Sequence, residues 1–228
     1  LAATGSAGAQ EPAPVEVRAQ GNPFYDSANL RFSPAAVTAA VGQTVRWTNT
    51  DTTVPHTATE DHDLWDLGGS YGATPANPPG MAPGTSVGRR FEAGVHRYHC
   101  RIHASMNGVV SVPVLLATAR RRVTRLVRVP VRIPGTRRTA VFRIRVGRTV
   151  TDVAMRWAPL PSGPDRVFDV EVRRGEGPYK RYATGTHRSS GMLIGQNPGT
   201  TFGVRARMRA KGGESRATDW SAAATIVS

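Results

Sequence analysis

Apolar and polar residues alternate in short runs over much of this 228-residue chain, and turns rich in glycine and proline separate the runs. In residues 44–49, for example, Val45 and Trp47 alternate with polar neighbours and would share one face of a strand. No long stretch has the periodicity of an amphipathic helix. The pattern therefore predicts an all-β fold, with short antiparallel strands assembled into sandwiches.

The runs and the charge divide the chain into two units. The strand-like runs of the first half are residues 15–18, 36–39, 44–49, 86–91, 95–100 and 109–112. The formal net charge of +14 is concentrated in the second half, because residues 10–112 carry −2 and residues 113–228 carry +16. This asymmetry indicates two joined units with different partners. We place the first unit at residues 14–115 and the second at residues 150–228, with an arginine-rich linker or hairpin at residues 116–149 between them.

The amino terminus has the composition of a processed export signal. The chain does not begin with Met, and small residues precede Gln10. A small-x-small pattern of this kind is typical of a signal-peptide cleavage site. We therefore interpret residues 1–13 as a signal-peptide remnant and leader, and expect the protein to be secreted, periplasmic or associated with the cell surface. No run is long and apolar enough to predict a transmembrane segment.

Four residues form a candidate metal site. Cys100, His103 and Met106 are spaced as C-x2-H-x2-M, and His56 lies upstream between Pro55 and Thr57. One thiolate, two imidazoles and one thioether are the ligands of a blue-copper electron-transfer centre. Cys100 is the only cysteine, so an internal disulfide is excluded. Zinc remains an alternative for a C-x2-H motif, although zinc sites usually contain more thiolates or histidines at finger spacing.

Strand alternation determines how these side chains could meet. Tyr98 and Cys100 would point to the same face of a strand, and Arg97 and Arg101 to the other. A strand that continued past Cys100 would send His103 to the opposite face. The motif therefore predicts that the strand ends near Cys100 and that a tight loop brings the ligands together. The remaining histidines, His62, His96, His99 and His187, are interpreted as ordinary surface or strand residues.

The first unit resembles the cupredoxins, most closely those of the plastocyanin and amicyanin type. The shared motifs are Phe32-x-Pro34, Gly42 to Asp51, Pro55-His56-Thr57, Asp66-x-Gly68 and Tyr98-x-Cys100-x-x-His103-x-x-Met106-x-Gly108. The resemblance implies a Greek-key β-sandwich that holds one type 1 copper. It implies His56, Cys100 and His103 as trigonal ligands, Met106 as a weak axial ligand, and the backbone of Thr57 as a hydrogen-bond donor to the Cys100 sulfur. The chain departs from the family at residues 71–80, which look like an insertion, and at Trp65.

The second unit resembles a fibronectin type III domain from residue 150 onward. The matching residues are the run 153–157, which resembles a strand with Trp157 in the core, the run 168–172, Phe202 where that fold usually has a tyrosine, and Trp220. Before it, residues 117–148 contain eleven arginines and no acidic residue. Alternation on either side of Pro134 and Gly135 predicts a hairpin there, with an arginine-lined face.

We therefore expect an extracytoplasmic one-electron carrier that works with redox partner proteins and is not an enzyme. Copper oxidases and nitrite reductases need a further copper cluster rich in His-x-His pairs, and this chain has no such pair. The alternative is a copper-binding carrier, or a cell-surface adhesion or binding protein, that has a cupredoxin frame and no electron-transfer role. The arginine-rich unit is a candidate docking surface for an anionic surface or polymer. We expect no nucleic acid, because no aromatic platform is interleaved with these arginines.

Overall fold

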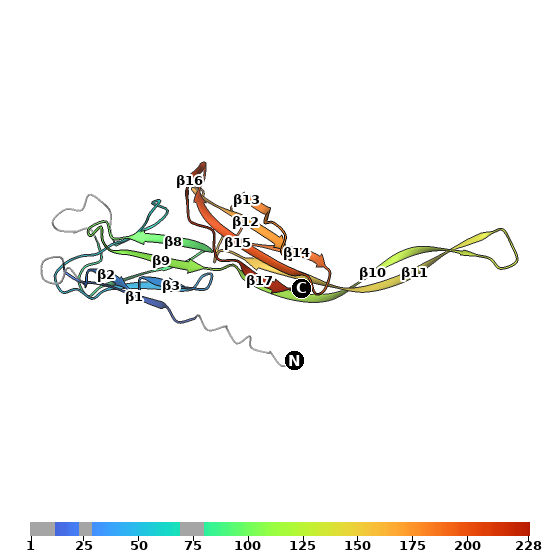
Figure 1. Ribbon diagram of the computed structural model, residues 1–228, viewed down its shortest axis with the longest axis horizontal. Helices are drawn as coiled ribbons and strands as arrows, with labels where there is room; N and C mark the ends of the chain where they lie inside the picture. The colour runs from blue at the N-terminus through green and yellow to red at the C-terminus, as the bar shows by residue number, and fades with distance from the viewer. Residues whose placement is uncertain (1–11, 23–28, 69–79) are drawn as a thin grey trace, which may run out of the picture.

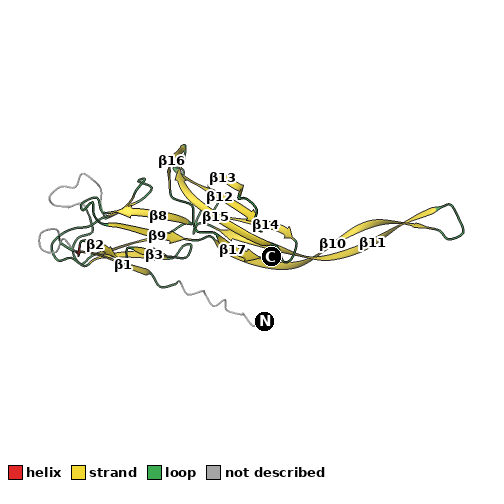
Figure 2. Ribbon diagram, viewed as in Figure 1, coloured by secondary structure: helices red, strands yellow, loops and turns green. Residues whose placement is uncertain are grey.

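The computed structural model describes residues 12–22, 29–68 and 80–228. Over these ranges the chain forms seventeen strands and no α-helix, which confirms the predicted all-β sandwich class (Figures 1 and 2). No helix in the described ranges is long and apolar enough to cross a membrane. Nearly all of the predicted leader at residues 1–13, and residues 71–79 of the predicted insertion, lie outside the described residues.

Strands β1 to β9 form two facing sheets, which we call the first sandwich. Their bounds are β1 Val15–Gln20, β2 Arg31–Ser33, β3 Ala36–Thr38, β4 Thr44–Asn49, β5 Ala58–Glu60, β6 Asp66–Leu67, β7 Ser86–Arg90, β8 Gly94–His99 and β9 Asn107–Val112. One sheet has the order β2-β1-β4-β7 and the other β3-β9-β8-β5-β6. Most neighbours are antiparallel, but β1 pairs with β4 and β3 with β9 in parallel. The predicted antiparallel arrangement of the strands therefore does not hold for these two pairs.

Aromatic side chains fill the space between these two sheets. Val45 and Trp47 of β4 are both fully buried, as their alternation predicts. The ring of Trp47 meets that of Tyr98 edge-on, with the centroids 5.4 Å apart. Phe32 lies 4.8 Å from the same Tyr98 ring, and Trp65 packs 5.4 Å from Phe91. Because such large rings each bury extensive apolar area, this cluster is a main source of stability for the end of β8 that leads into Cys100.

Strands β10 to β17 form a second sandwich. Their bounds are β10 Leu115–Arg132, β11 Thr139–Arg156, β12 Arg166–Arg174, β13 Lys180–Thr186, β14 Ser190–Gln196, β15 Thr201–Ala210, β16 Gly213–Ala217 and β17 Ala224–Val227. A three-stranded sheet in the order β10-β11-β14 faces a sheet in the order β13-β12-β15-β16, and β17 also pairs with β15. Trp157 is buried between the sheets, and its indole nitrogen donates to the Arg188 carbonyl at 2.6 Å.

The hairpin expected around Pro134 is much longer than the alternation alone indicates. β10 and β11 pair residue for residue from Leu115 opposite Arg156 to Arg132 opposite Thr139. Only the part of β11 from Thr151 onward has a second partner, β14. The remainder projects beyond both sandwiches as a twisted two-stranded ribbon (Figure 1).

The two sandwiches are joined by hydrogen bonds as well as by the chain. The amide of Ala93 donates to the Trp157 carbonyl at 2.6 Å, and Val95 forms an isolated antiparallel bridge with Asp219. Arg97 pairs with the Asp219 carboxylate at 2.9 Å. Arg216, in β16, donates to the backbone carbonyls of His62 and Asp63. The contacts fall near the start of β8 and on the β5–β6 turn, whereas Cys100 follows the opposite end of β8.

An acidic side chain organises the second sandwich. Asp169 in β12 is buried and accepts bonds from Arg207, Arg209 and the Gly185 amide at 3.0–3.2 Å. Burial alone would raise the pKa of this carboxyl, but the Gly185 amide and the two arginines lower it below 3.8 overall. The ion pairs are therefore intact at neutral pH.

Replacing Asp169 with Asn is expected to lower the free energy of unfolding of the second sandwich by about 3 kcal/mol, because Arg209 would be left buried without its counter-ion. The folded pKa lies below the unfolded one, so the contribution is present above pH 3.8 and is lost as the pH falls through the folded pKa. Chemical denaturation at pH 7 measures the change. Asp165→Asn, at an exposed acid, is the matched control, with an expected change within about 0.5 kcal/mol. Equal effects of the two substitutions would contradict the role of Asp169.

Candidate metal centre

Cys100 lies directly after β8, at the start of a closed loop. Gly94, His96 and Tyr98 of β8 are buried while Arg97 is exposed, so Cys100 continues the inward-facing series and is itself fully buried. The strand ends at His99, as the spacing of the motif requires. The Cys100 amide then donates to the Met106 carbonyl and the Met106 amide to the His103 carbonyl, each at 3.0 Å. These two bonds fold the loop back on itself.

His56 reaches the same place from the segment between β4 and β5. It forms an antiparallel bridge with Met81, in which the Met81 amide donates to the His56 carbonyl at 2.6 Å. Asn49, at the end of β4, donates to the carbonyls of Val54 and Met81 at 2.8 Å. Gly80 has a φ of 113°, and a Cβ there would lie 2.8 Å from the His56 carbonyl oxygen. Glycine is therefore required for the close approach that fixes His56.

The structure brings His56, Cys100 and His103 to one point. Their donor atoms all lie within 4.8 Å of one another, so this group could hold one copper ion. The two Nδ1 atoms of His56 and His103 are 3.2 Å apart, and the Cys100 Sγ lies 3.7 Å from Nδ1 of His103. Metal–nitrogen bonds of about 2.0 Å and metal–sulfur bonds of about 2.3 Å, at angles of roughly 100–120°, separate such donors by about 3.1–3.7 Å. The two separations that involve His103 therefore match those of donors bound to a single metal ion.

Both imidazoles are held in the form that binds a metal. Burial, together with repulsion from His103, lowers the pKa of His56 to about 4. Burial also lowers the pKa of His103. Neutral imidazole offers a lone pair, whereas the protonated ring does not, so both residues are competent ligands at neutral pH.

The Cys100 sulfur has a fixed hydrogen-bond environment. The Thr57 amide donates to Sγ at 3.3 Å. The Thr57 hydroxyl accepts from the Arg101 amide at 2.8 Å, and the Thr59 hydroxyl is 3.3 Å from it. Thr57 therefore bonds both to the Cys100 sulfur and to the backbone that directly follows Cys100. The sequence pattern identified Thr57 but not Thr59. The two residues are two positions apart in an extended segment, so they point to the same side, and this spacing could have identified Thr59.

Met106 is fully buried and is connected to Cys100 by the backbone bond described above. The next residue, Asn107, begins β9, whose pairing with β8 fixes both ends of the loop. The structure therefore places Met106 in the buried part of the loop that carries Cys100 and His103.

The other histidines lie apart from this group. His62 bonds Glu60 at 3.1 Å, His99 bonds Asp61 at 2.8 Å, and His187 bonds Ser162 at 2.9 Å. His96 differs from the expectation of an ordinary position because it is completely buried between the Glu92 carbonyl and the Trp65 indole. Its inward orientation follows from the same alternation that places Tyr98 in the core.

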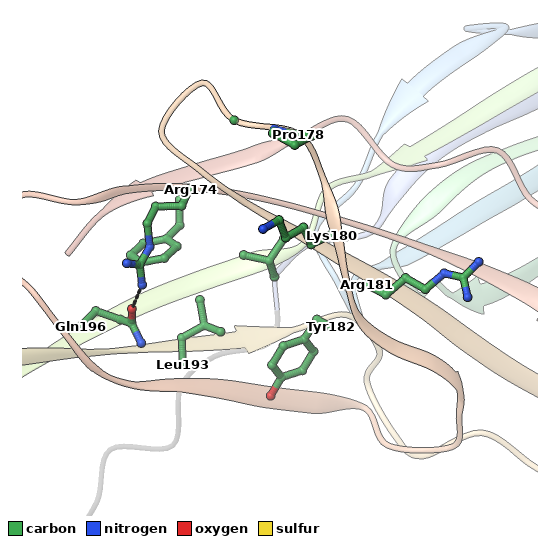
Figure 3. A pocket seen from close by; sticks show the side chains of 10 residues that line it. Arg174, Pro178, Lys180, Arg181, Tyr182, Leu193 and Gln196 are labelled. Atoms are coloured by element: carbon green, nitrogen blue, oxygen red, sulfur yellow. Dashed lines mark hydrogen bonds between the residues drawn. The ribbon is translucent and has the colours of Figure 1, made fainter.

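A cavity of about 510 Å³ lies in the second sandwich, far along the sequence from these residues. Arg174, Lys180 and Leu193 are among the residues that line it, and Arg174 donates to Gln196 (Figure 3). No histidine, cysteine or acidic residue is among its described lining residues, so this cavity has none of the usual metal-ligating side chains.

Comparisons with known proteins agree with the geometry of the first sandwich. Residues 20–113 match the family described as copper binding proteins of the plastocyanin/azurin family. The chain is 38% identical over 90 residues to a chloroplastic plastocyanin of Tetradesmus obliquus, a match that covers 38% of this chain and 61% of the relative. The chain thus spans about three fifths of the length of that curated relative.

Two solved structures resemble part of the chain. A purple cupredoxin from Nitrosopumilus maritimus is 27% identical, with 43% of this chain and 98% of that chain covered and a TM-score of 0.33. A copper-containing nitrite reductase from Thermus scotoductus is 28% identical, with 47% of this chain and 24% of that chain covered and a TM-score of 0.33. The family match and the plastocyanin relative together support a cupredoxin domain of the plastocyanin/azurin type over residues 20–113, and the family match ends before β10.

Proposed function

We propose that the first sandwich is a type 1 copper domain and that the protein is a one-electron carrier. The observation that carries the proposal is the convergence of His56 Nδ1, His103 Nδ1 and Cys100 Sγ on one point. In this proposal His56, Cys100 and His103 are the trigonal ligands and Met106 is the weak axial ligand. A thiolate, two imidazoles and a thioether are the mixture of soft and borderline ligands that suits both oxidation states of copper.

The chain's contribution is to hold these ligands still. When bound, copper supplies a one-electron couple between Cu(I) and Cu(II). The bridge between His56 and Met81 and the closed 100–106 loop fix the ligands before any metal enters. His56 and Cys100 are fully buried, which excludes water from most of the site. A preformed, dry site changes little between oxidation states, and that favours rapid electron transfer.

The electron route proposed here leads through His103. His103 is partly exposed, whereas His56 and Cys100 are fully buried. The neighbours of His103 in the sequence, Ile102 and Ala104, are exposed as well. A redox partner protein that docks on this end would approach the copper through the His103 ring edge. The absence of His-x-His pairs in the sequence favours a carrier over a multicopper enzyme.

The second sandwich is proposed to be a fibronectin type III-like module, at residues 150–228, attached through the 116–149 segment. Its three-stranded and larger antiparallel sheets, with Trp157 and Phe202 buried between them, support this assignment. Such modules serve as spacers and binding units. We propose an extracytoplasmic location, secreted or periplasmic, by analogy with the plastocyanin-type domain.

The experiment that tests the carrier function is voltammetry of the copper-loaded protein. We expect one copper per chain and a reversible one-electron couple. A copper-binding protein with no electron-transfer role would bind the metal but show no reversible couple, and that result would favour the alternative of a copper carrier or adhesion protein.

Met106→Leu is expected to leave copper bound and to raise the reduction potential. Leucine fills the same volume but removes the thioether, and a weak axial ligand tunes the couple more than it holds the metal. Metal analysis after dialysis and the midpoint potential measure the two effects. Met192→Leu, at an exposed methionine of the second sandwich, is the matched control and should change neither. Loss of copper, or an unchanged potential, in Met106→Leu would contradict the axial role.

A further inference from the structure

The ribbon, defined here as residues 120–148 of β10 and β11 with their turn, contacts the rest of the described chain at its base, where Arg121 bonds Asp152 and Arg148 bonds Asn197. Its strands pair only with each other, because β14 reaches β11 only from Thr151 onward. Figure 1 shows it extending away from both sandwiches. A two-stranded ribbon that packs against no further layer is only marginally stable in water. A ribbon of this length therefore suggests that a partner covers it.

The register places apolar side chains on one side of the ribbon. Directly opposed residues of an antiparallel pair point to the same side. Val127 opposes Ile144, and Val129 opposes Phe142. The apolar face consists of these residues and their neighbours on the same side: Val127, Val129, Val131, Ala140, Phe142, Ile144 and Val146. Phe142 is 55% exposed and Ile144 46%, so this face is largely open to solvent.

The opposite side is dominated by arginine. The arginine face carries Arg122, Arg128, Arg132, Arg143 and Arg145, together with Leu126 and Val141. Arg128 and Arg143 oppose each other directly, which places two like charges side by side. Among the described residues none of these five arginines has an ion pair, and Arg121 is paired only at the base, with Asp152. The charge of these five arginines is therefore not neutralised by ion pairs within residues 12–22, 29–68 and 80–228.

Arginines also border the apolar face at both ends. Arg125 and Arg148 lie on its side at the base, opposite Val146 and Val123, and Arg137 and Arg138 lie in the turn. An apolar strip bordered by cations is the pattern of elements that lie in the interface of an anionic bilayer. Long arginine side chains on the other face can also reach around a narrow ribbon to lipid phosphates.

We propose that the ribbon docks on the surface of an anionic phospholipid bilayer, with the apolar face toward the acyl chains and the arginines on lipid phosphates. A second copy of the chain is a poor occupant, because it would bring two ribbons of eleven arginines and no acid together. A linear polyanion would neutralise the arginines but leave the apolar face in water. The interface of an anionic bilayer both neutralises the arginines and removes the apolar face from water. The proposal does not depend on the metal site.

The test is flotation of the full chain with vesicles. We expect the protein to float with vesicles of phosphatidylcholine and phosphatidylglycerol in equal parts, and to stay behind with pure phosphatidylcholine vesicles. Raising the salt concentration should weaken the binding, because it screens the arginines. Absence of flotation with the anionic vesicles would overturn the proposal.

Two variants separate the contributions of the faces. The triple variant Arg128→Gln, Arg143→Gln and Arg145→Gln should weaken partitioning to anionic vesicles about 100-fold, from the contribution of each basic residue near such a surface. Its control, Arg181→Gln, Arg188→Gln and Lys211→Gln, removes the same charge from exposed positions of the second sandwich and should change partitioning less than threefold.

The double variant Phe142→Ser and Ile144→Ser should weaken binding to vesicles at least tenfold and leave retention on dextran sulfate unchanged. Both residues are exposed, so thermal unfolding should match the unmodified chain. If the serine variant bound vesicles as tightly as the unmodified chain, the ribbon would be a site for acidic macromolecules instead. If the control triple variant lost as much binding as the ribbon variant, the effect would be one of net charge alone.

Discussion

Cys100→Ser is expected to abolish the intense visible absorption of the Cu(II)-loaded protein. That absorption arises from charge transfer between a thiolate and Cu(II), and a serine oxygen neither ionises at neutral pH nor offers a soft donor. The fold should survive, because a serine hydroxyl can accept the Thr57 amide bond that Sγ accepts now. The visible spectrum after addition of one equivalent of Cu(II) measures the effect.

His99→Gln is the matched control for this substitution. His99 directly precedes Cys100 in the sequence, but its side chain pairs with Asp61 and lies outside the converging group. Its replacement should leave the absorption unchanged. If Cys100→Ser kept the colour, or if His99→Gln removed it, the sulfur of Cys100 would not be the donor responsible.

Gly108→Ala is expected to lower the free energy of unfolding of the first sandwich by about 3 kcal/mol. Gly108 of β9 is directly opposite Tyr98 of β8, and a Cβ at this position would overlap the Tyr98 ring. That ring is packed against Trp47 and Phe32 and cannot move without disturbing the core, and such overpacking costs about 1–3 kcal/mol or more. Because Tyr98 lies two residues before Cys100, the copper spectrum should change as well.

Thermal and denaturant unfolding of Gly108→Ala test this expectation. Gly163→Ala is the control, because a Cβ there meets no atom within 4 Å and the residue has no left-handed backbone. Its effect should stay within about 0.5 kcal/mol. A Gly108→Ala protein as stable as the unmodified chain would show that the Tyr98 ring does not fill the space over β9.

The strand alternation around Cys100 was sufficient to predict the local geometry of the site. A side-chain period of two fixes which residues of 94–100 face inward, and a metal motif with offsets of three and six requires a loop after Cys100. The approach of His56 could not be derived in this way. It depends on the bridge to Met81 and on the Asn49 side chain, which are contacts between residues far apart in the sequence.

The length and the solvent exposure of the ribbon could not be predicted from the sequence pattern. Alternation around Pro134 predicted a hairpin, but alternation does not say whether both faces of a strand are covered. The length of β10 and β11 depends on continuous pairing through Arg120, Arg121 and Arg122, where no apolar alternation marks a strand. The parallel pairing of β1 with β4 likewise depends on the order of strands in the sheet, which a local pattern does not encode.

X-ray absorption spectroscopy of the protein loaded with one equivalent of copper identifies the atoms that bind the metal. The account predicts one short bond to sulfur and two bonds to imidazole nitrogen, from Cys100, His56 and His103, and loss of the sulfur contribution in Cys100→Ser. A copper environment composed only of nitrogen and oxygen neighbours in the unmodified protein would contradict it.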